Sequence, residues 1–117
     1  MEKKIWKNAE GEQMVQYRLT FKDSSQWLAN VFMKENGWIM ISSDFGDWSW
    51  RFCFNGSFED FILQLEVGYF AGKVRQGWNY LSTSRQMEKS AKNFAEHVLT
   101  ALQEAINESR CNEISAL

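Results

Sequence analysis

The sequence contains no proline, and its 117 residues include only seven glycines, two cysteines and one histidine. Without proline, the ends of strands and helices must be marked by glycine and by clusters of polar residues. Cys53 and Cys111 lack the spacing of a metal site or a redox pair. Cys53 lies in a run typical of a strand and is expected to be a buried free thiol, which fits a reducing compartment.

Long apolar runs and a strong net charge are also missing. No stretch approaches the ~20 apolar residues of a membrane span. The start of the chain, Met1 to Asn8, lacks the apolar run of a signal peptide, so we expect a soluble, cytoplasmic protein. The formal charge of −2 is too small to predict an anionic partner, and it argues against non-specific binding to nucleic acid.

The charges are distributed unevenly along the chain. Residues 36–70 contain one cation, Arg51, and five acids, which gives this segment a net charge of −4. Residues 1–35 and 71–117 each carry six cations and five acids. The five acids of the middle segment are Asp44, Asp47, Glu59, Asp60 and Glu66.

Aromatic residues are abundant, since nine Phe, six Trp and three Tyr make up 15% of the chain. Each such ring can bury ~150–250 Å², so we expect most of them to form the core of one small domain. Aromatic residues are also enriched at binding hot spots, and composition alone does not separate these two uses.

Alternating apolar and polar residues predict an antiparallel sheet in the first half of the chain. The alternation is clear at residues 15–21 and mixed at residues 27–35. Asn36-Gly37 predicts a type I′ hairpin turn, because this turn needs positive φ at both central residues. Residues 38–42 then return as the partner strand.

The last predicted strand has a wholly aromatic face. It follows a second turn at residues 44–47, and its alternating aromatic residues are Trp48, Trp50, Phe52 and Phe54. We expect this face to pack on a helix and to belong to the core. A homodimer through an exposed edge strand, at residues 14–21 or 48–54, is also open.

A first helix is predicted over about residues 58–72. Ser57 can cap its free amides, and Glu59 and Asp60 suit the positive end of a helix. Phe58, Phe61, Ile62, Leu65 and Tyr69 recur at helical spacing. A glycine inside a helix weakens it, so we expect a bend near Gly68.

The rest of the chain completes an α+β fold. Residues 73–83 are expected to form a loop, and an apolar stripe predicts a second helix over about residues 85–108. The predicted architecture is a four-stranded antiparallel β-meander (about residues 14–54) covered on one face by the two helices. Residues 1–109 form one domain, and residues 110–117 a flexible C-terminal tail.

No arrangement of residues in the sequence predicts catalysis. His97 is expected on the solvated side of the last helix, with no nucleophile in reach. Asp44 and Asp47 bracket a turn too short to supply the oxygen ligands of a metal ion, and Asp favours turns for its own hydrogen bonds. We therefore expect no catalytic residue, no metal and no cofactor. A small enzyme that uses an acid or Cys53 is the least favoured alternative.

A nucleic-acid-binding accessory factor is a stronger alternative. Aromatic residues on a sheet beside Arg51 are similar to platforms on which the bases of single strands stack. Such platforms need a cationic groove that follows the phosphates. The surrounding segment has a net charge of −4, which disfavours direct binding of nucleic acid.

Residues 39–73 carry a pattern of their own. The run Ser42 to Phe52, followed by a Phe-x-x-Phe helix that ends in Tyr69-x-x-x-Lys73, resembles small accessory proteins of tailed phages and prophages. Those proteins carry Ser-x-Asp-Tyr-Gly-x-Trp-x-Tyr-Arg-Trp. Phe45 and Trp50 replace two of their tyrosines, which keeps the ring and loses the hydroxyl. The family is mostly of unassigned function, so the resemblance implies a phage context and no catalytic residues.

The phage context implies a class of activity. Small phage accessory proteins often bind a host protein stoichiometrically, and some inhibit CRISPR or other nuclease defences. A compact acidic domain can occupy a basic channel by charge complementarity, which mainly speeds association. The resemblance therefore favours a non-enzymatic protein that binds a host protein in the bacterial cytoplasm. The candidate contact residues are Asp44, Asp47, Arg51, Glu59 and Asp60, although Arg51 could instead form an ion pair with Asp44 or Asp47.

Overall fold

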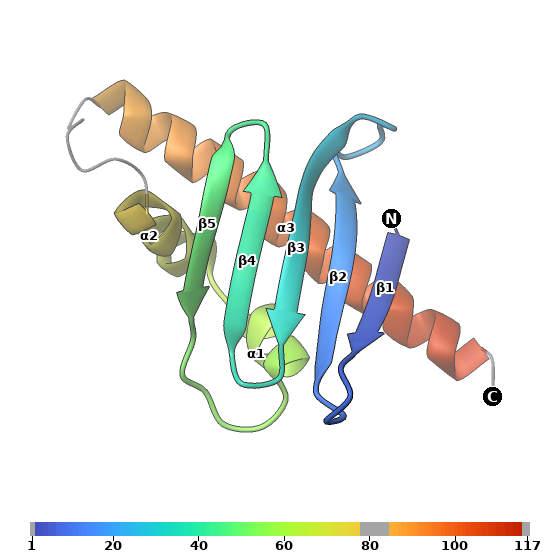
Figure 1. Ribbon diagram of the computed structural model, residues 1–117. Helices are drawn as coiled ribbons and strands as arrows, with labels where there is room; N and C mark the ends of the chain where they lie inside the picture. The colour runs from blue at the N-terminus through green and yellow to red at the C-terminus, as the bar shows by residue number, and fades with distance from the viewer. Residues whose placement is uncertain (1, 78–84, 116–117) are drawn as a thin grey trace.

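Five strands follow one another along the first half of the chain and pair antiparallel in sequence order. The computed structural model describes residues 2–77 and 85–115, and the sheet faces the viewer in Figure 1. The strands are β1 (Glu2–Lys7), β2 (Gln13–Thr20), β3 (Trp27–Lys34), β4 (Trp38–Ser43) and β5 (Gly46–Arg51). The general α+β class is confirmed, with five strands instead of four.

The unpredicted strand is β1, which pairs with β2 from Glu2↔Arg18 to Lys7↔Gln13. Its sequence, EKKIWK, gives no alternation signal because nearly every side chain in it is exposed. Since β1 covers β2, the predicted free edge at residues 14–21 is wrong. The edges of the sheet are β1 and β5.

The turn between β3 and β4 is not the predicted type I′ turn. Gly37 has a positive φ of 97°, whereas Asn36 does not. The Gly37 amide donates to the Lys34 carbonyl (3.0 Å), and the Trp38 amide donates to Asn36 Oδ1 (3.2 Å). A turn that ends in one glycine with positive φ is typical of hairpin loops longer than two residues.

The core lies between the sheet and the helices, and aromatic residues fill much of it. Trp48 and Phe52 are buried, while Trp50 and Phe54 are half-buried and pack against the core. The predicted aromatic core face is confirmed, although β5 ends at Arg51. Cys53 was expected to be buried and is exposed. The reason is alternation, because Phe52 turns inward and its neighbour therefore turns outward.

Three helices follow the sheet: α1 (Phe58–Gln64), α2 (Val67–Gly77) and α3 (Arg85–Ser115). The predicted cap is present, since Ser57 Oγ accepts from the Asp60 amide (3.3 Å). The predicted bend becomes a break at Leu65, earlier than Gly68. Gln103 of α3 donates to the carbonyls of Ile62 (3.0 Å) and Leu65 (3.2 Å). The Ile62 carbonyl also accepts from the Leu65 amide (3.1 Å), whereas the Leu65 carbonyl lies beyond the end of α1, where no helical amide follows.

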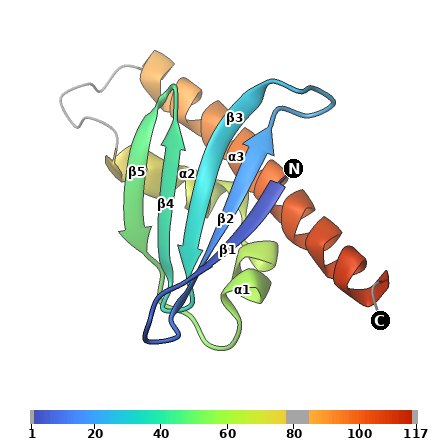
Figure 2. The ribbon, with the colours of Figure 1, turned by 45° about the vertical axis from the view of Figure 1, so that its right-hand side comes forward.

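The long helix α3 crosses behind the sheet, and all three helices lie on that side (Figures 1 and 2). Its apolar stripe is buried, as predicted. It continues to Ser115, past the end predicted at about residue 108, so residues 110–115 are helical where a tail was predicted. Lys3 Nζ donates to Ser109 Oγ (2.7 Å), which ties this end to β1. Of the predicted loop 73–83, α2 occupies residues 73–77, and residues 78–83 lie outside the described residues.

Candidate functional site

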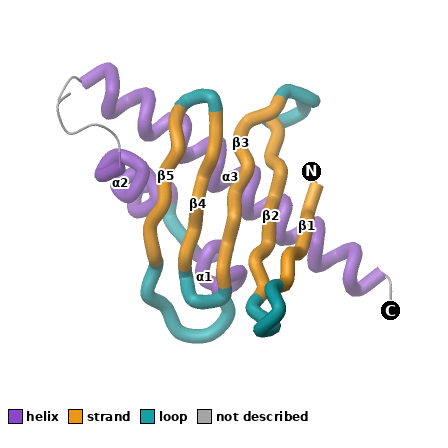
Figure 3. Tube along the Cα trace, viewed as in Figure 1, coloured by secondary structure: helices purple, strands orange, loops and turns teal. Residues whose placement is uncertain are grey.

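The five predicted contact residues do not form one site. Asp44 lies in the turn that joins β4 to β5, and Asp47 is the second residue of β5. This end of the sheet is the upper one in Figure 3, while Glu59 and Asp60 lie on α1 at the lower end. Arg51 ends β5, where it pairs with Trp38. The negative charge of the middle segment is therefore divided between two ends of the molecule.

We call residues 44–47, which are the β4–β5 turn and the first two residues of β5, the acidic tip. Phe45 is 55% exposed there, and its ring centroid lies 5.2 Å from that of Phe94 on α3. The Ser43 hydroxyl donates to the carbonyl of Gly46 (2.8 Å) and accepts from the Phe45 amide (3.1 Å). These contacts hold the turn in one conformation.

Both carboxylates of the acidic tip are free to meet a partner. Asp44 and Asp47 are exposed, and neither makes a side-chain hydrogen bond or ion pair with the described residues. The possible ion pair with Arg51 does not form. The register places Asp47 opposite Ser42 and Arg51 opposite Trp38, about 13 Å apart along the strand. Arg51 Nε donates to the Asn36 carbonyl instead (3.0 Å).

Glu59 and Asp60 join α1 to the rest of the molecule. Arg110 of α3 lies 2.6 Å from Asp60 Oδ1 and 3.6 Å from Glu59 Oε2. The buried Tyr17 donates its hydroxyl to Glu59 Oε1 (3.1 Å). The hydrogen bond with Asp60, helped by the two negative charges, raises the pKa of the Arg110 guanidinium. These contacts give the two acids a structural role.

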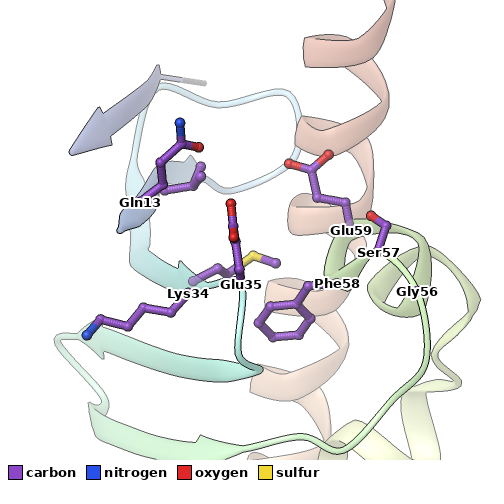
Figure 4. A pocket seen from close by; sticks show the side chains of 9 residues that line it. Gln13, Lys34, Glu35, Gly56, Ser57, Phe58 and Glu59 are labelled. Atoms are coloured by element: carbon purple, nitrogen blue, oxygen red, sulfur yellow. The ribbon is translucent and has the colours of Figure 1, made fainter. Parts of the chain in front are cut away.

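A cleft of about 480 Å³ opens between α1 and the lower end of β2 and β3. Figure 4 shows the side chains of Gln13, Glu35 and Glu59 around its mouth, with the ring of Phe58 beside them. The ammonium group of Lys34 points away from the cleft. Glu59 already has two partners within the protein, so the cleft offers chiefly the Glu35 carboxylate and the Gln13 amide to a ligand.

A further exposed apolar surface was not predicted. It is the side of the sheet that faces away from the helices, which we call the open face and which faces the viewer in Figure 1. Trp6 is 50% exposed there, and Trp38 and Met40 are each 43% exposed. Phe32 and Met14 are half-buried on the same face. With Trp38 and Met40 they line a hollow of about 220 Å³.

Strand register arranges the open face in three rows that cross all five strands. The lower row contains Trp6, Met14, Lys34, Trp38 and Arg51. The middle row contains Lys4, Gln16, Phe32, Met40 and Ser49. The tip row, nearest the acidic tip, contains Glu2, Arg18, Asn30, Ser42 and Asp47.

A pattern that could have revealed the open face is present in β4. Ile39 and Ile41 are buried, so alternation turns Trp38 and Met40 outward. The exposure of Trp6 was not predictable, because β1 itself was missed.

The residues considered for catalysis lie apart. His97 is exposed on α3, as predicted, with its ring 5.7 Å from that of Phe21. Cys53 and Cys111 are free and exposed. Among residues 2–77 and 85–115, no group of three or more His, Cys, Asp or Glu side chains is placed to hold a metal ion. No helix in these two ranges is long and apolar enough to cross a membrane.

Comparison with known proteins gives a phage context. A family model, Phage_phiTE_072, described as a phage family, matches residues 8–114. Searches of curated proteins and of solved structures found no significant match. The family match spans the sheet from the end of β1 onward and all three helices. The chain therefore belongs to this phage family.

Proposed function

We propose that the protein is a non-enzymatic phage accessory protein that binds a host protein stoichiometrically and thereby inhibits it. A nuclease defence of the CRISPR kind is the class of target that we propose. Membership of a phage family supports the context. The observation that carries the proposal is Phe45, a large apolar side chain that is 55% exposed between two free carboxylates.

The acidic tip has the properties of a protein-binding anchor. Aromatic side chains that enter a pocket on the partner supply much of the energy of many interfaces. Asp44 and Asp47 suit a basic surface, because complementary charge speeds the encounter and fixes its orientation. The contact of Phe45 with Phe94 and the two hydrogen bonds of Ser43 order the turn before binding. A pre-ordered turn loses less conformational entropy on association.

The alternative of a small enzyme receives less support from the positions of its candidate residues. Asp44 and Asp47 are exposed at the end of the sheet where β4 turns into β5 (Figure 1), and Cys53 is exposed after the end of β5. Catalytic groups usually converge in a concave site from which water can be excluded. Recognition of a partner needs no such enclosure.

Capture of a partner from a bacterial host lysate tests the proposal. The immobilised wild-type protein is expected to retain a host protein saturably, at one copy per chain. Phe45→Ala should weaken this binding by about 2 kcal/mol or more, the size of a hot-spot contact. Asp44→Asn with Asp47→Asn should mainly slow association. Glu104→Gln, on the exposed side of α3, is the charge control.

Two results would overturn the proposal. One is that no host protein binds saturably to the wild-type chain. The other is that the Phe45 and Asp variants bind a captured partner as tightly and as fast as the wild type does. Circular dichroism and thermal unfolding of each variant distinguish a lost contact from a lost fold.

A further inference from the structure

The lower and middle rows of the open face combine aromatic rings with cations. Trp6 and Trp38 share the lower row with Lys34, and Phe32 shares the middle row with Lys4. Trp6 Nε1 donates to Gln16 Oε1 (3.3 Å), which holds the indole over β2. The rings are therefore oriented at the surface rather than packed into the core.

The charge of these two rows differs in sign from that of the whole chain. They contain the cations Lys4, Lys34 and Arg51 and no carboxylate, which gives them a net charge of +3. The tip row adds Arg18, Glu2 and Asp47, so the open face as a whole carries +2, against −2 for the chain. The low net charge of the sequence conceals a separation of charge in space.

Among the residues that the structure describes, no carboxylate forms an ion pair with these cations. Lys4 and Lys34 make no side-chain hydrogen bond or ion pair with the described residues, and Arg51 uses Nε on the Asn36 carbonyl. Of the acids of the middle segment, the strand register places Asp47 in the tip row and none in the lower or middle row. Glu59 and Asp60 contact Arg110 on the other side of the sheet. The net charge of −4 that disfavoured nucleic acid in the sequence is thus not the charge of this surface.

We propose that the open face binds single-stranded nucleic acid, with bases stacked on Trp6 and Trp38 and phosphates held by Lys4, Lys34 and Arg51. This inference goes beyond the proposed function, because it rests on the lower and middle rows of the open face, which contain no residue of the acidic tip; Asp47 belongs to the acidic tip and to the tip row. Aromatic side chains on an uncovered sheet, with cations around them, are the means by which proteins hold unpaired bases. The amides of Gln16 and Asn30 add hydrogen-bonding groups on the same face.

The size of the face sets the length of the bound segment. Five strands spaced about 4.8 Å apart make each row roughly 19 Å long, which suits about four nucleotides, the lower end of known site sizes. Double-stranded DNA keeps its bases stacked inside the helix and offers the indole rings no base face. A second copy of the chain would place its open face, with a charge of +2, against the same face with the same charge. Charge complementarity therefore favours the nucleic acid.

Fluorescence anisotropy with labelled (dT)20, (rU)20 and a 20-base-pair duplex tests the inference. We expect saturable binding of at least one single-stranded probe, at least ten-fold tighter than binding of the duplex. With about three phosphates neutralised, the slope of log K against log salt should be about −2. Trp38→Ala should weaken binding about 5- to 150-fold, the range for the loss of one base–aromatic stack. Lys34→Glu should also weaken it and flatten the salt slope.

Matched controls separate this site from general charge effects. Lys92→Glu changes the same charge on the exposed side of α3, and Phe45→Ala removes an equally exposed ring at the acidic tip. Both should bind the probe like the wild type. If Trp38→Ala unfolds, Trp6→Ala and Lys34→Glu carry the same test.

Three results would overturn the inference. The first is a titration of the single-stranded probes that stays flat to about 100 μM protein at low salt, where even non-specific binders respond. The second is binding of the duplex as tight as binding of the single strands. The third is a loss of binding in Lys92→Glu equal to the loss in Lys34→Glu. A host protein whose capture depends on Trp38 rather than on Phe45 would assign the open face to protein instead. Because the host-protein proposal is tested by the Phe45 variant in lysate, either proposal can fail while the other stands.

Discussion

Gly37 and Phe52 lie in backbone contact where the β3–β4 turn meets the end of β5. The Phe52 amide donates to the Gly37 carbonyl (2.9 Å), and a Cβ atom added to Gly37 would lie 2.2 Å from the Phe52 carbonyl oxygen. Gly37 also has a φ of 97°. This contact fixes the turn that presents Trp38 and the carbonyl that accepts from Arg51.

The substitution Gly37→Ala should therefore be strongly destabilising. We expect a loss of at least about 2 kcal/mol in the free energy of unfolding, because backbone strain of about 1–3 kcal/mol adds to a clash that backbone atoms cannot avoid. Urea denaturation measures the change. Gly11→Ala is the matched control, since Gly11 has a similar φ of 87° but no atom within 4 Å of its added Cβ. Equal losses for the two variants would contradict this explanation.

The aromatic core predicts a second large effect. Phe94 of α3 is buried, and its ring lies 5.0 Å from Trp48 and 5.2 Å from Phe45. Phe94→Ala should lower the free energy of unfolding by about 3–5 kcal/mol, the usual cost of a cavity of that size. Chemical denaturation of the variant measures it. A loss below about 1 kcal/mol would mean that α3 does not pack on β5 as described.

Tryptophan fluorescence should separate the two faces of the sheet. Trp6 and Trp38 are about half exposed, whereas Trp48 is 4% exposed. Acrylamide should therefore quench Trp6 and Trp38, and Trp6→Phe with Trp38→Phe should remove most of the quenchable signal contributed by the sheet. A double variant that stays as quenchable as the wild type would show that these indoles are covered.

The contacts of Arg110 should contribute little and should not respond to pH near neutrality. Arg110→Gln should cost no more than about 1 kcal/mol, because the ion pairs are largely exposed. A cation whose pKa is raised on folding stabilises the protein below its unfolded pKa and loses this effect as pH rises through the folded pKa. For arginine both values lie far above neutrality, so the difference between Arg110→Gln and wild type should be the same at about pH 6 and pH 9.

Thermal unfolding at the two pH values, with Lys92→Gln as the control, measures this small effect. A difference that grows by more than about 1 kcal/mol between them would assign Arg110 a titrating partner that the structure does not show.

The sequence predicted the elements in which buried side chains alternate with exposed ones or recur at helical spacing. This pattern is present in the inward residues of β2, in the aromatic face that follows Asp47 and in the apolar stripe of α3, because each of these elements buries one side in the core. The strand β1 has almost no buried side chain and gives no such signal. The continuation of α3 past residue 108 is supported by tertiary contacts at Ser109 and Arg110, which local pattern does not contain.

The candidate site could be predicted from the sequence to a smaller extent than the fold. Charge counted along the chain grouped Asp44, Asp47, Glu59 and Asp60, whereas the fold separates the first pair from the second. The exposure of residues 44–47 could be predicted from the preference of Asp for turns. The exposure of the open face could not be predicted in this way, because only the strand register places residues such as Trp6 and Arg51 on one face, at opposite ends of the same row.

The central claim is that recognition is divided between the acidic tip and the open face, and a crossed experiment tests it most directly. Phe45→Ala and Trp38→Ala are each assayed for host-protein capture and for (dT)20 binding. The account predicts that Phe45→Ala loses the protein and keeps the oligonucleotide, while Trp38→Ala does the reverse. Loss of both activities in each folded variant, or of neither, would contradict it.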